Sequence, residues 1–133
     1  GTPIQQLLEE ARVKVNINKV IFGGPMMGIA QGNIESAVTI KGTGGILVLT
    51  DAQKWESHAC IRCGRCIDSC PYGLNPSELS ILCEAKEFNL ALDNNVMECK
   101  ECGCCSYICP AKRPIVHLIK FAKADIAKRK AKA

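Results

Sequence analysis

Eight of the ten cysteines in this chain form two runs with the same spacing. The first run is CIRCGRCIDSCP, from Cys60 to Pro71, and the second is CKECGCCSYICP, from Cys99 to Pro110. Each reads C-x2-C-x2-C-x3-C-P, and the second repeats the first at a constant offset of 39 residues. Cysteine thiolates bind zinc and iron–sulfur clusters, so the two runs predict metal binding.

The spacing within each run resembles that of bacterial ferredoxins with two [4Fe-4S] clusters, in which the fourth cysteine of a run binds the other cluster. Three cysteines at C-x2-C-x2-C wrap the backbone around one corner of a cubane, and the fourth points away from it. Two such clusters held close together suit electron transfer. The resemblance implies two crossed ligand sets: Cys60, Cys63, Cys66 and Cys109 for one cluster, and Cys99, Cys102, Cys105 and Cys70 for the other.

Two other uses of the cysteines remain open. Zinc ribbons also contain C-x2-C pairs, but a tetrahedral zinc site takes two pairs and leaves the third cysteine and the proline of each run unexplained. Disulfides are disfavoured, because residues 1–20 do not resemble a secretory signal and a reducing compartment is the better expectation. The longest strongly apolar run, residues 46–49, is far shorter than the roughly 20 residues that span a bilayer.

Some residues outside the runs have simpler interpretations. Cys83 is expected on a helix as a small buried apolar residue, and Cys104 is expected to be a non-ligand beside Cys105. KGTGGI is no dinucleotide fingerprint, because a strand follows it where a helix is required. GGPMMG is typical of a tight turn with two packing methionines. No nucleophile with a base, no paired carboxylates and no base-stacking aromatics are recognisable, so neither a catalytic residue nor nucleic-acid binding is predicted.

An α+β fold follows from the elements around the runs. TPIQQLLEEA predicts a helix with Thr2 as N-cap, Pro3 at the first position and Gln5 closing a capping box. The segments KVIFGG, SAVTIKG and GILVLT predict three strands after it. The apolar face of the predicted helix comprises Ile4, Leu7, Leu8 and Ala11.

Helices are predicted after each cysteine run. NPSELSILCEAKEF starts with Asn75 as cap, Pro76 at the first position and Glu78 at the third. RPIVHLIKFAKADIAKRK predicts an amphipathic helix with lysines opposite its apolar face. That face comprises Ile115, Leu118, Ile119, Ala122 and Ile126.

Four segments, in order, resemble the C subunit of the Rnf complex, a membrane-bound bacterial ion-translocating ferredoxin:NAD+ oxidoreductase. They are VIFGGPMMG, VTIKGTGGILVLT, ACIRCGRCIDSCPYGLNP and CKECGCCSYICPAKRPIVHLIKFAK. The resemblance covers nearly the whole chain and implies a C-terminal fragment of that subunit. Residues 1–54 would be a β-grasp-like domain that is incomplete at its N-terminus. Residues 55–133 would be a helical ferredoxin-type domain with two [4Fe-4S] clusters.

The same resemblance implies cofactors and partners. FMN and NADH are expected only on the missing N-terminal region of the subunit, so this chain alone is not expected to oxidise NADH. Met26 and Met27 could face that flavin region, as an alternative to the turn interpretation. Electrons would pass between the flavin site and other subunits of a complex on the cytoplasmic, inner face of the bacterial cell membrane. A cobalamin-reductase-type flavoprotein and a structural or sensory iron–sulfur protein are the alternatives; two clusters favour electron transfer, since a structural role needs only one.

Basic residues are concentrated near the end of the chain. The formal net charge of +4 counts every cysteine as neutral, and it falls to about zero once eight thiolates and two oxidised clusters are included. A solvated helix face is one interpretation of the basic segment. Contact with an anionic membrane surface or an acidic partner subunit is the other. The basic residues are Lys120, Lys123, Lys128, Arg129, Lys130 and Lys132.

Overall fold

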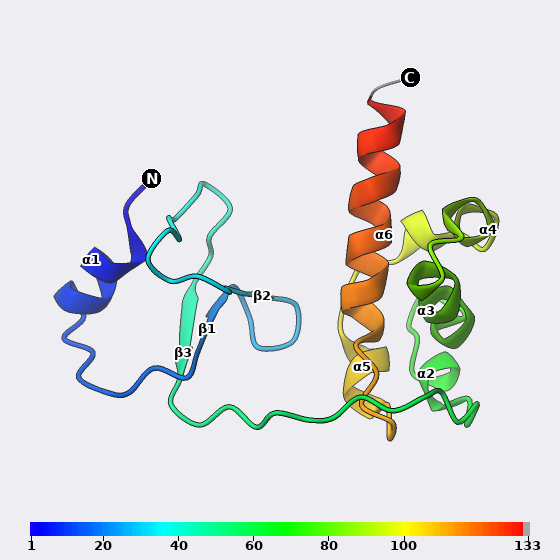
Figure 1. The fold of residues 1–133 in the computed structure, drawn as a ribbon, viewed down its shortest axis with the longest axis horizontal. Coiled ribbons are helices and arrows are strands. Elements are labelled where there is room, and N and C mark those ends of the chain that lie inside the picture. Colours follow the sequence, from blue (N-terminus) through cyan, green and yellow to red (C-terminus); the bar gives the residue numbers. More distant parts are fainter. Residues whose placement is uncertain (132–133) are drawn as a thin grey trace. The chain divides into compact units, whose positions relative to one another are not determined.

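The structure is a computed structural model that describes residues 1–131, and it divides into two compact units at Lys54 and Trp55 (Figure 1). Each unit has a hydrophobic core of its own. The first unit contains a sheet and one helix, and the second is helical. The predicted α+β class is therefore confirmed.

The first unit is built on a three-stranded antiparallel sheet in the order β2-β1-β3. In β1, Val20 pairs with Val48 and Phe22 pairs with both Ile46 and Ile29. The elements of this unit are α1 (Ile4–Glu10), β1 (Lys19–Phe22), β2 (Ile29–Ala30) and β3 (Ile46–Leu49). The fully buried residues Ile4 and Val20, together with Ala37, form its small core.

The strand predicted over SAVTIKG is wrong. In this segment Val38 forms an isolated bridge to Pro3, and turns on either side of it bond the N–H of Ala37 to the Ile34 carbonyl and the N–H of Thr43 to the Ile40 carbonyl. The side-chain oxygen of Asn33 accepts hydrogen bonds from the backbone N–H groups of Glu35 and Ser36, which competes with strand pairing. The two-residue strand β2 was not predicted, whereas the strands at β1 and β3 are confirmed.

The predicted cap of α1 is also wrong. Pro3 rather than Thr2 is the N-cap, and no side chain of the described residues caps this helix end. The carbonyl of Thr2 instead accepts a hydrogen bond of 2.9 Å from the backbone N–H of Thr39. Of the predicted apolar face only Ile4 is buried, so α1 is held mainly at its first turn.

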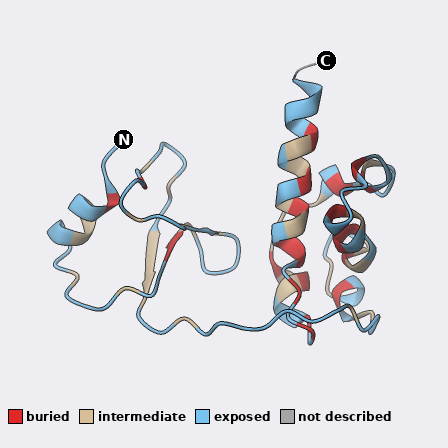
Figure 2. Cartoon of the chain, in the orientation of Figure 1, coloured by how far each residue is buried: buried red, intermediate tan, exposed pale blue. Residues whose placement is uncertain are grey.

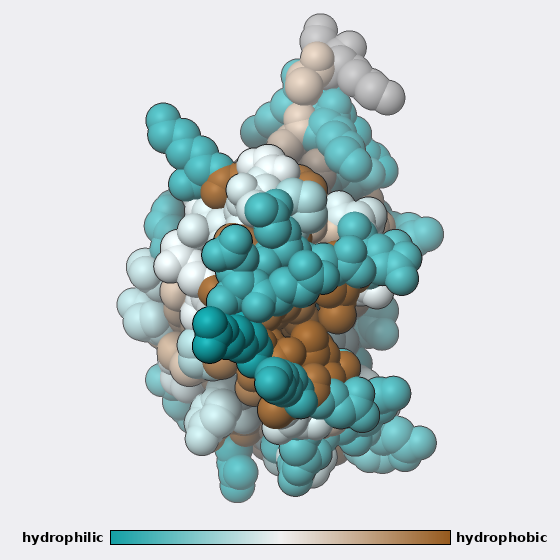
Figure 3. All heavy atoms as spheres, turned by 90° about the vertical axis from the view of Figure 1, so that its left-hand side faces the viewer, coloured by the Kyte–Doolittle hydropathy of each residue, from teal (hydrophilic) through white to brown (hydrophobic). Residues whose placement is uncertain are grey.

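GGPMMG forms a closed turn, as predicted. The N–H of Gly28 donates to the carbonyl of Gly24 at 2.8 Å, and a Cβ added at Gly28 would come within 2.4 Å of that same oxygen. Met26 and Met27 are about half exposed, so the prediction that these two methionines pack is wrong. Ile29 and Ile40 are also exposed. Figure 3 shows a face of the molecule on which hydrophobic residues gather between hydrophilic ones.

The second unit packs its helices around one apolar core. Leu79 of α3, and Ile115 and Ile119 of α6, are at most 2% exposed (Figure 2). These two helices lie side by side along the core. The elements are α2 (Arg65–Asp68), α3 (Pro76–Glu84), α4 (Phe88–Asp93), the 3-10 helix η1 (Val96–Glu98), α5 (Cys104–Ile108) and α6 (Ile115–Lys130).

The helix signals of this unit are confirmed. The Asn75 side chain accepts from the N–H of Glu78 at 3.2 Å and donates to its carboxylate at 3.0 Å, which makes the predicted cap of α3. The predicted apolar face of α6 is buried except for Leu118, which is half-buried. The segment after Glu84 divides, because Lys86 adopts a positive φ of 61° and α4 then begins at Phe88.

Replacing Leu79 by alanine should destabilise the second unit by about 2–5 kcal/mol, the range for deleting a buried leucine side chain. Leu79 is 0% exposed in the core of the second unit. Ile81 lies on the same helix but is 42% exposed, so Ile81→Ala is a matched control with a much smaller expected loss. Urea unfolding of the iron-loaded protein, followed by circular dichroism, measures both variants. Equal losses in the two would contradict the described core.

Candidate metal centre

The two cysteine runs and the residues just after them share several backbone features. Three pairs of positions separated by 39 residues share a positive φ, although several are not glycine. The backbone N–H groups of Gly73 and Lys112 also donate to the carbonyls of Cys70 and Cys109, each at 3.2 Å. The paired positions are Arg62 (53°) with Glu101 (59°), Gly64 (76°) with Gly103 (90°), and Gly73 (63°) with Lys112 (51°).

A short helix follows the second cysteine of each run. Gly64 caps α2 and Gly103 caps α5, both in the left-handed region that glycine adopts without a steric penalty. The turn places the third cysteines, Cys66 and Cys105, in the first turn of each helix, where they are buried. No described atom lies within 4 Å of a Cβ added at Gly64, so backbone conformation is the visible reason for this glycine.

A first cavity brings together thiols from both runs. Burial raises the pKa of the Cys66 thiol, and the neighbouring thiols of Cys109, Cys60 and Cys63 raise it further. The four cysteines thus lie around one space. The cysteines that line this cavity are Cys60, Cys63 and Cys66 of the first run and Cys109 of the second.

A second cavity repeats this arrangement with the roles of the runs exchanged. Burial raises the pKa of Cys105 to about 11, and Cys99 and Cys102 contribute to that increase. Burial likewise raises the pKa of Cys99. The cysteines that line the second cavity are Cys99, Cys102, Cys104 and Cys105 of the second run and Cys70 of the first.

Both cavities fit a [4Fe-4S] cluster by the chemistry of their donors. Each offers the first three pattern cysteines of one run and the fourth of the other, which is the donor set of a four-iron cluster, and the second offers Cys104 in addition. Thiols whose pKa is raised by burial become thiolates when bound iron supplies positive charge. Among residues 1–131, no three His, Cys, Asp or Glu side chains could share a single metal ion. A four-iron core binds its thiolates on separate iron atoms, so they need not meet at one point.

Comparison with known proteins identifies relatives of the whole described chain. Residues 54–75 match the family model described as "4Fe-4S binding domain". The C subunit of the proton-translocating ferredoxin:NAD(+) oxidoreductase complex of Clostridium ljungdahlii is 47% identical over 110 residues, which is 80% of this chain and 24% of the relative. The C subunit of the ion-translocating oxidoreductase complex of Rhodobacter capsulatus is 40% identical over 135 residues, 99% of this chain and 26% of the relative.

The chain is a relative of the C subunit of the ion-translocating oxidoreductases. A third example, from the Na(+)-translocating complex of Acetobacterium woodii, is 40% identical over 99% of this chain and 30% of its own length. The predicted resemblance is thereby confirmed, and so is a [4Fe-4S]-binding segment. The chain spans about a quarter of the length of these relatives. None of the helices described within residues 1–131 is long and apolar enough to cross a membrane.

The two cysteines outside the predicted ligand sets differ in their surroundings. Cys83 is 1% exposed in the core, as predicted, and burial raises its pKa. Cys104 instead lines the second cavity, and a hydrogen bond with the Cys102 side chain raises its pKa. That Cys104 is not a ligand stays a prediction.

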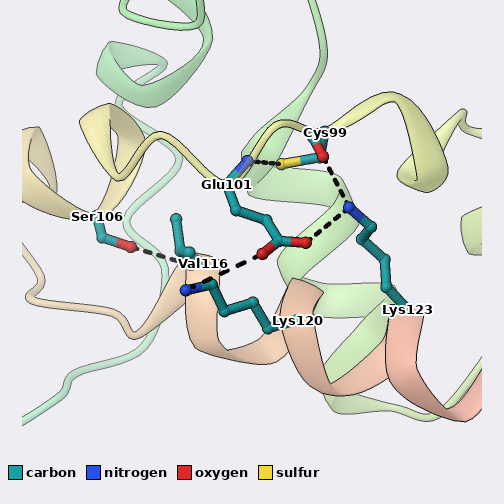
Figure 4. Close-up of polar contacts among 6 residues, drawn as sticks. All are labelled: Cys99, Glu101, Ser106, Val116, Lys120 and Lys123. Atoms are coloured by element: carbon teal, nitrogen blue, oxygen red, sulfur yellow. Dashed lines mark hydrogen bonds and ion pairs between the residues drawn. The ribbon is translucent and has the colours of Figure 1, made fainter. Parts of the chain in front are cut away.

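A group of charges beside the second run was not predicted (Figure 4). Lys123 on α6 donates to the Cys99 carbonyl at 2.8 Å and to the Glu101 carboxylate at 2.6 Å. Lys120 lies 4.0 Å from the same carboxylate. The backbone N–H of Glu101 in turn donates to the Cys99 sulfur at 3.4 Å. Lys120 and Lys123 therefore bind α6 to the second run. The prediction that the lysines of this helix lie opposite its packed face is wrong for these two residues.

Arg113 is a second charged residue that the spacing of cysteines did not indicate. Its side chain is 8% exposed, and Nη2 lies 2.6 Å from a carboxylate oxygen of Glu84. Arg113 lines the first cavity beside the cysteines. The sequence does not indicate that Arg113 forms a buried ion pair beside the first cavity, because its partner Glu84 is 29 residues away in the chain.

Proposed function

We propose that this chain is an electron-transfer module with two [4Fe-4S] clusters in an Rnf-type ion-translocating oxidoreductase complex. The observation that supports this most directly is the pair of cavities, each lined by the first three pattern cysteines of one run and the fourth of the other, with Cys104 as an additional thiol at the second. When bound, the clusters supply one-electron redox chemistry. The proposed ligands are Cys60, Cys63, Cys66 and Cys109 for the first cluster, and Cys99, Cys102, Cys105 and Cys70 for the second.

The protein's own residues would shield each cluster unequally. Cys66 and Cys109 are buried, whereas Cys63 is exposed at the same cavity. Ile61, close to it in sequence, is 65% exposed. An electron partner could therefore approach the first cluster closely on the side of Cys63, whereas Cys66 and Cys109 lie on its buried side.

The partners are proposed from the relatives. The Clostridium ljungdahlii relative is named as part of a ferredoxin:NAD(+) oxidoreductase complex. For this chain we propose electron transfer between an FMN and NADH site on a part of such a subunit outside this chain and other subunits of the complex. These relatives favour the Rnf type over the cobalamin-reductase alternative.

A peripheral position on the inner face of the membrane remains part of the proposal. Not all basic side chains of α6 are available to bind an anionic membrane surface. Arg129 pairs with Asp125 and lies 4.9 Å over the Phe88 ring. Lys128 and Lys130 are exposed, whereas Lys132 lies outside the described residues. Contact with an anionic surface therefore rests on fewer cations than the six in the sequence.

Anaerobic reconstitution with iron and sulfide tests the proposal. We expect about eight iron and eight sulfide per chain, from two cubanes. Reversible one-electron reduction of both clusters, followed by EPR, is expected of an electron-transfer module and not of a structural site. Tightly bound zinc without visible charge-transfer absorption would contradict the cluster assignment, and clusters that resist reduction would favour the structural alternative.

A further inference from the structure

The two cavities differ in the residues that stand beside their thiols. The runs repeat at an offset of 39 residues, and the same offset relates several other lining residues of the first cavity to lining residues of the second. At three of these positions the first cavity is polar and the second is apolar. Ser77, Ser80 and Arg113 line the first cavity, and their counterparts Val116, Ile119 and Leu74 line the second.

Arg113 is the charged residue of this polar wall, and one of its donors is unused. Its side chain is 92% buried, and Nη2 binds Glu84. Its Nε is buried and has no hydrogen-bond partner among the described residues of the chain. A buried N–H without an acceptor is unfavourable and rare, so an acceptor is expected in the space that Arg113 lines.

The neighbouring serines do not supply that acceptor. Ser80 is fully buried, and its hydroxyl donates to the Ser77 carbonyl at 2.8 Å. The Ser77 hydroxyl donates to the Asn75 side chain at 2.8 Å. Neither serine oxygen accepts a hydrogen bond from Nε, so a group bound in the cavity that Arg113 lines is the remaining candidate acceptor.

We infer that Arg113 donates a hydrogen bond from Nε to a sulfur of the first cluster and raises the reduction potential of that cluster. The inference rests on the proposed function, since it needs a cluster in the first cavity. Reduction adds one electron and makes the sulfur atoms more negative, so a buried cationic donor stabilises the reduced form more than the oxidised one. Glu84 offsets part of this charge, but it is 58% exposed and its field is screened by water.

The charges beside the second run do not take the same position. Lys123 bonds the Glu101 carboxylate and the Cys99 carbonyl, and the backbone N–H of Glu101 donates to the Cys99 sulfur, but neither residue lines the second cavity. Leu74 occupies the place that corresponds to Arg113. Among the lining residues, a buried cationic side chain with an unused donor is thus found at the first cavity and not at the second.

Arg113→Leu tests the inference. It removes the donor and the charge, and it places a leucine where the second cavity has a leucine at the equivalent position. The cluster-loaded full chain is titrated anaerobically with EPR detection. We expect the equilibrium constant for one-electron reduction of the first cluster to fall about tenfold or more. Each factor of ten lowers its reduction potential by about 59 mV, and the potential of the second cluster should not change. The first cluster is identified as the one whose signal changes in Cys60→Ser.

Two further variants provide a control and an opposite shift. Arg65 is exposed on α2 and does not line the first cavity, so Arg65→Leu removes a nearby cation and should change the potential little. Glu84→Gln leaves the guanidinium uncompensated and should raise the potential of the first cluster. If fully loaded Arg113→Leu keeps both wild-type potentials, the inference is wrong. If that variant loses its first cluster, an unchanged potential in Glu84→Gln overturns the inference instead. Iron and sulfide contents of the wild type, measured beforehand, show separately whether the proposed function fails.

Discussion

Replacing Cys109 by serine should remove or strongly perturb the cluster that the first cysteine run holds, although Cys109 belongs to the second run. The reason is the crossed lining of the cavities, in which Cys109 joins Cys60, Cys63 and Cys66. Cys70→Ser should in the same way damage the cluster of the second run. EPR spectra of the reduced single variants, with iron and sulfide analysis, measure which signal is lost.

The remaining two cysteines are the matched controls for this experiment. Cys83→Ala removes a buried thiol from the core and should leave both EPR signals in place, although it costs some stability. Cys104→Ala removes a thiol that lines the second cavity and should also leave both signals. If Cys70→Ser perturbs the same cluster as Cys60→Ser, the crossed pairing is wrong, and loss of a signal in Cys104→Ala would make Cys104 a ligand.

The features that the sequence predicts well depend on residues close together in the chain. The cap of α3 joins Asn75 to Glu78, three residues apart, and the apolar face of α6 is a periodic pattern within one helix. The cysteine spacing is equally local, and its repeat at a constant offset makes two equivalent sites visible. The ligand sets stay a prediction, which the lining of the two cavities supports.

The features that the sequence does not predict depend on distant partners. Thr2 has the local signal of a cap, but its carbonyl pairs with Thr39 across 37 residues. The helical pattern of α6 predicts lysines that face solvent, but Lys123 reaches Glu101 in the second run. Single-residue propensities and periodicity contain no information on such pairs, so the charged surroundings of both cavities become visible only in the structure.

Removing the iron should unfold the second unit from about residue 58 onward while the first unit keeps its sheet. The hydrophobic core of the second unit is built against the two cavities, since Ile115 lines the first and both Leu79 and Ile119 line the second. Loss of the clusters would leave the core residues facing empty space on two sides, and metal binding in such domains is coupled to folding.

Backbone strain in the runs and just after the second one adds to this effect. Arg62, Glu101 and Lys112 are held at positive φ, a conformation that costs a non-glycine residue of order 1 kcal/mol or more and persists only where the surroundings enforce it. Without clusters the runs are free to relax, and the short helices α2 and α5, four and five residues long, have too few hydrogen bonds to form alone.

Hydrogen exchange before and after anaerobic chelation measures this prediction, and the first unit is the control within the same molecule. The core of that unit contains Ile4, Val20 and Ala37 and shares no residue with the cluster cavities, so the amides paired between β1 and β3 should stay protected. Amides of α3 and α6 should lose their protection together. An apo protein that keeps full helical content and protected α6 amides would show that apolar packing alone holds this unit. The clusters would then bind to a fold that forms without them, and would not be part of its core.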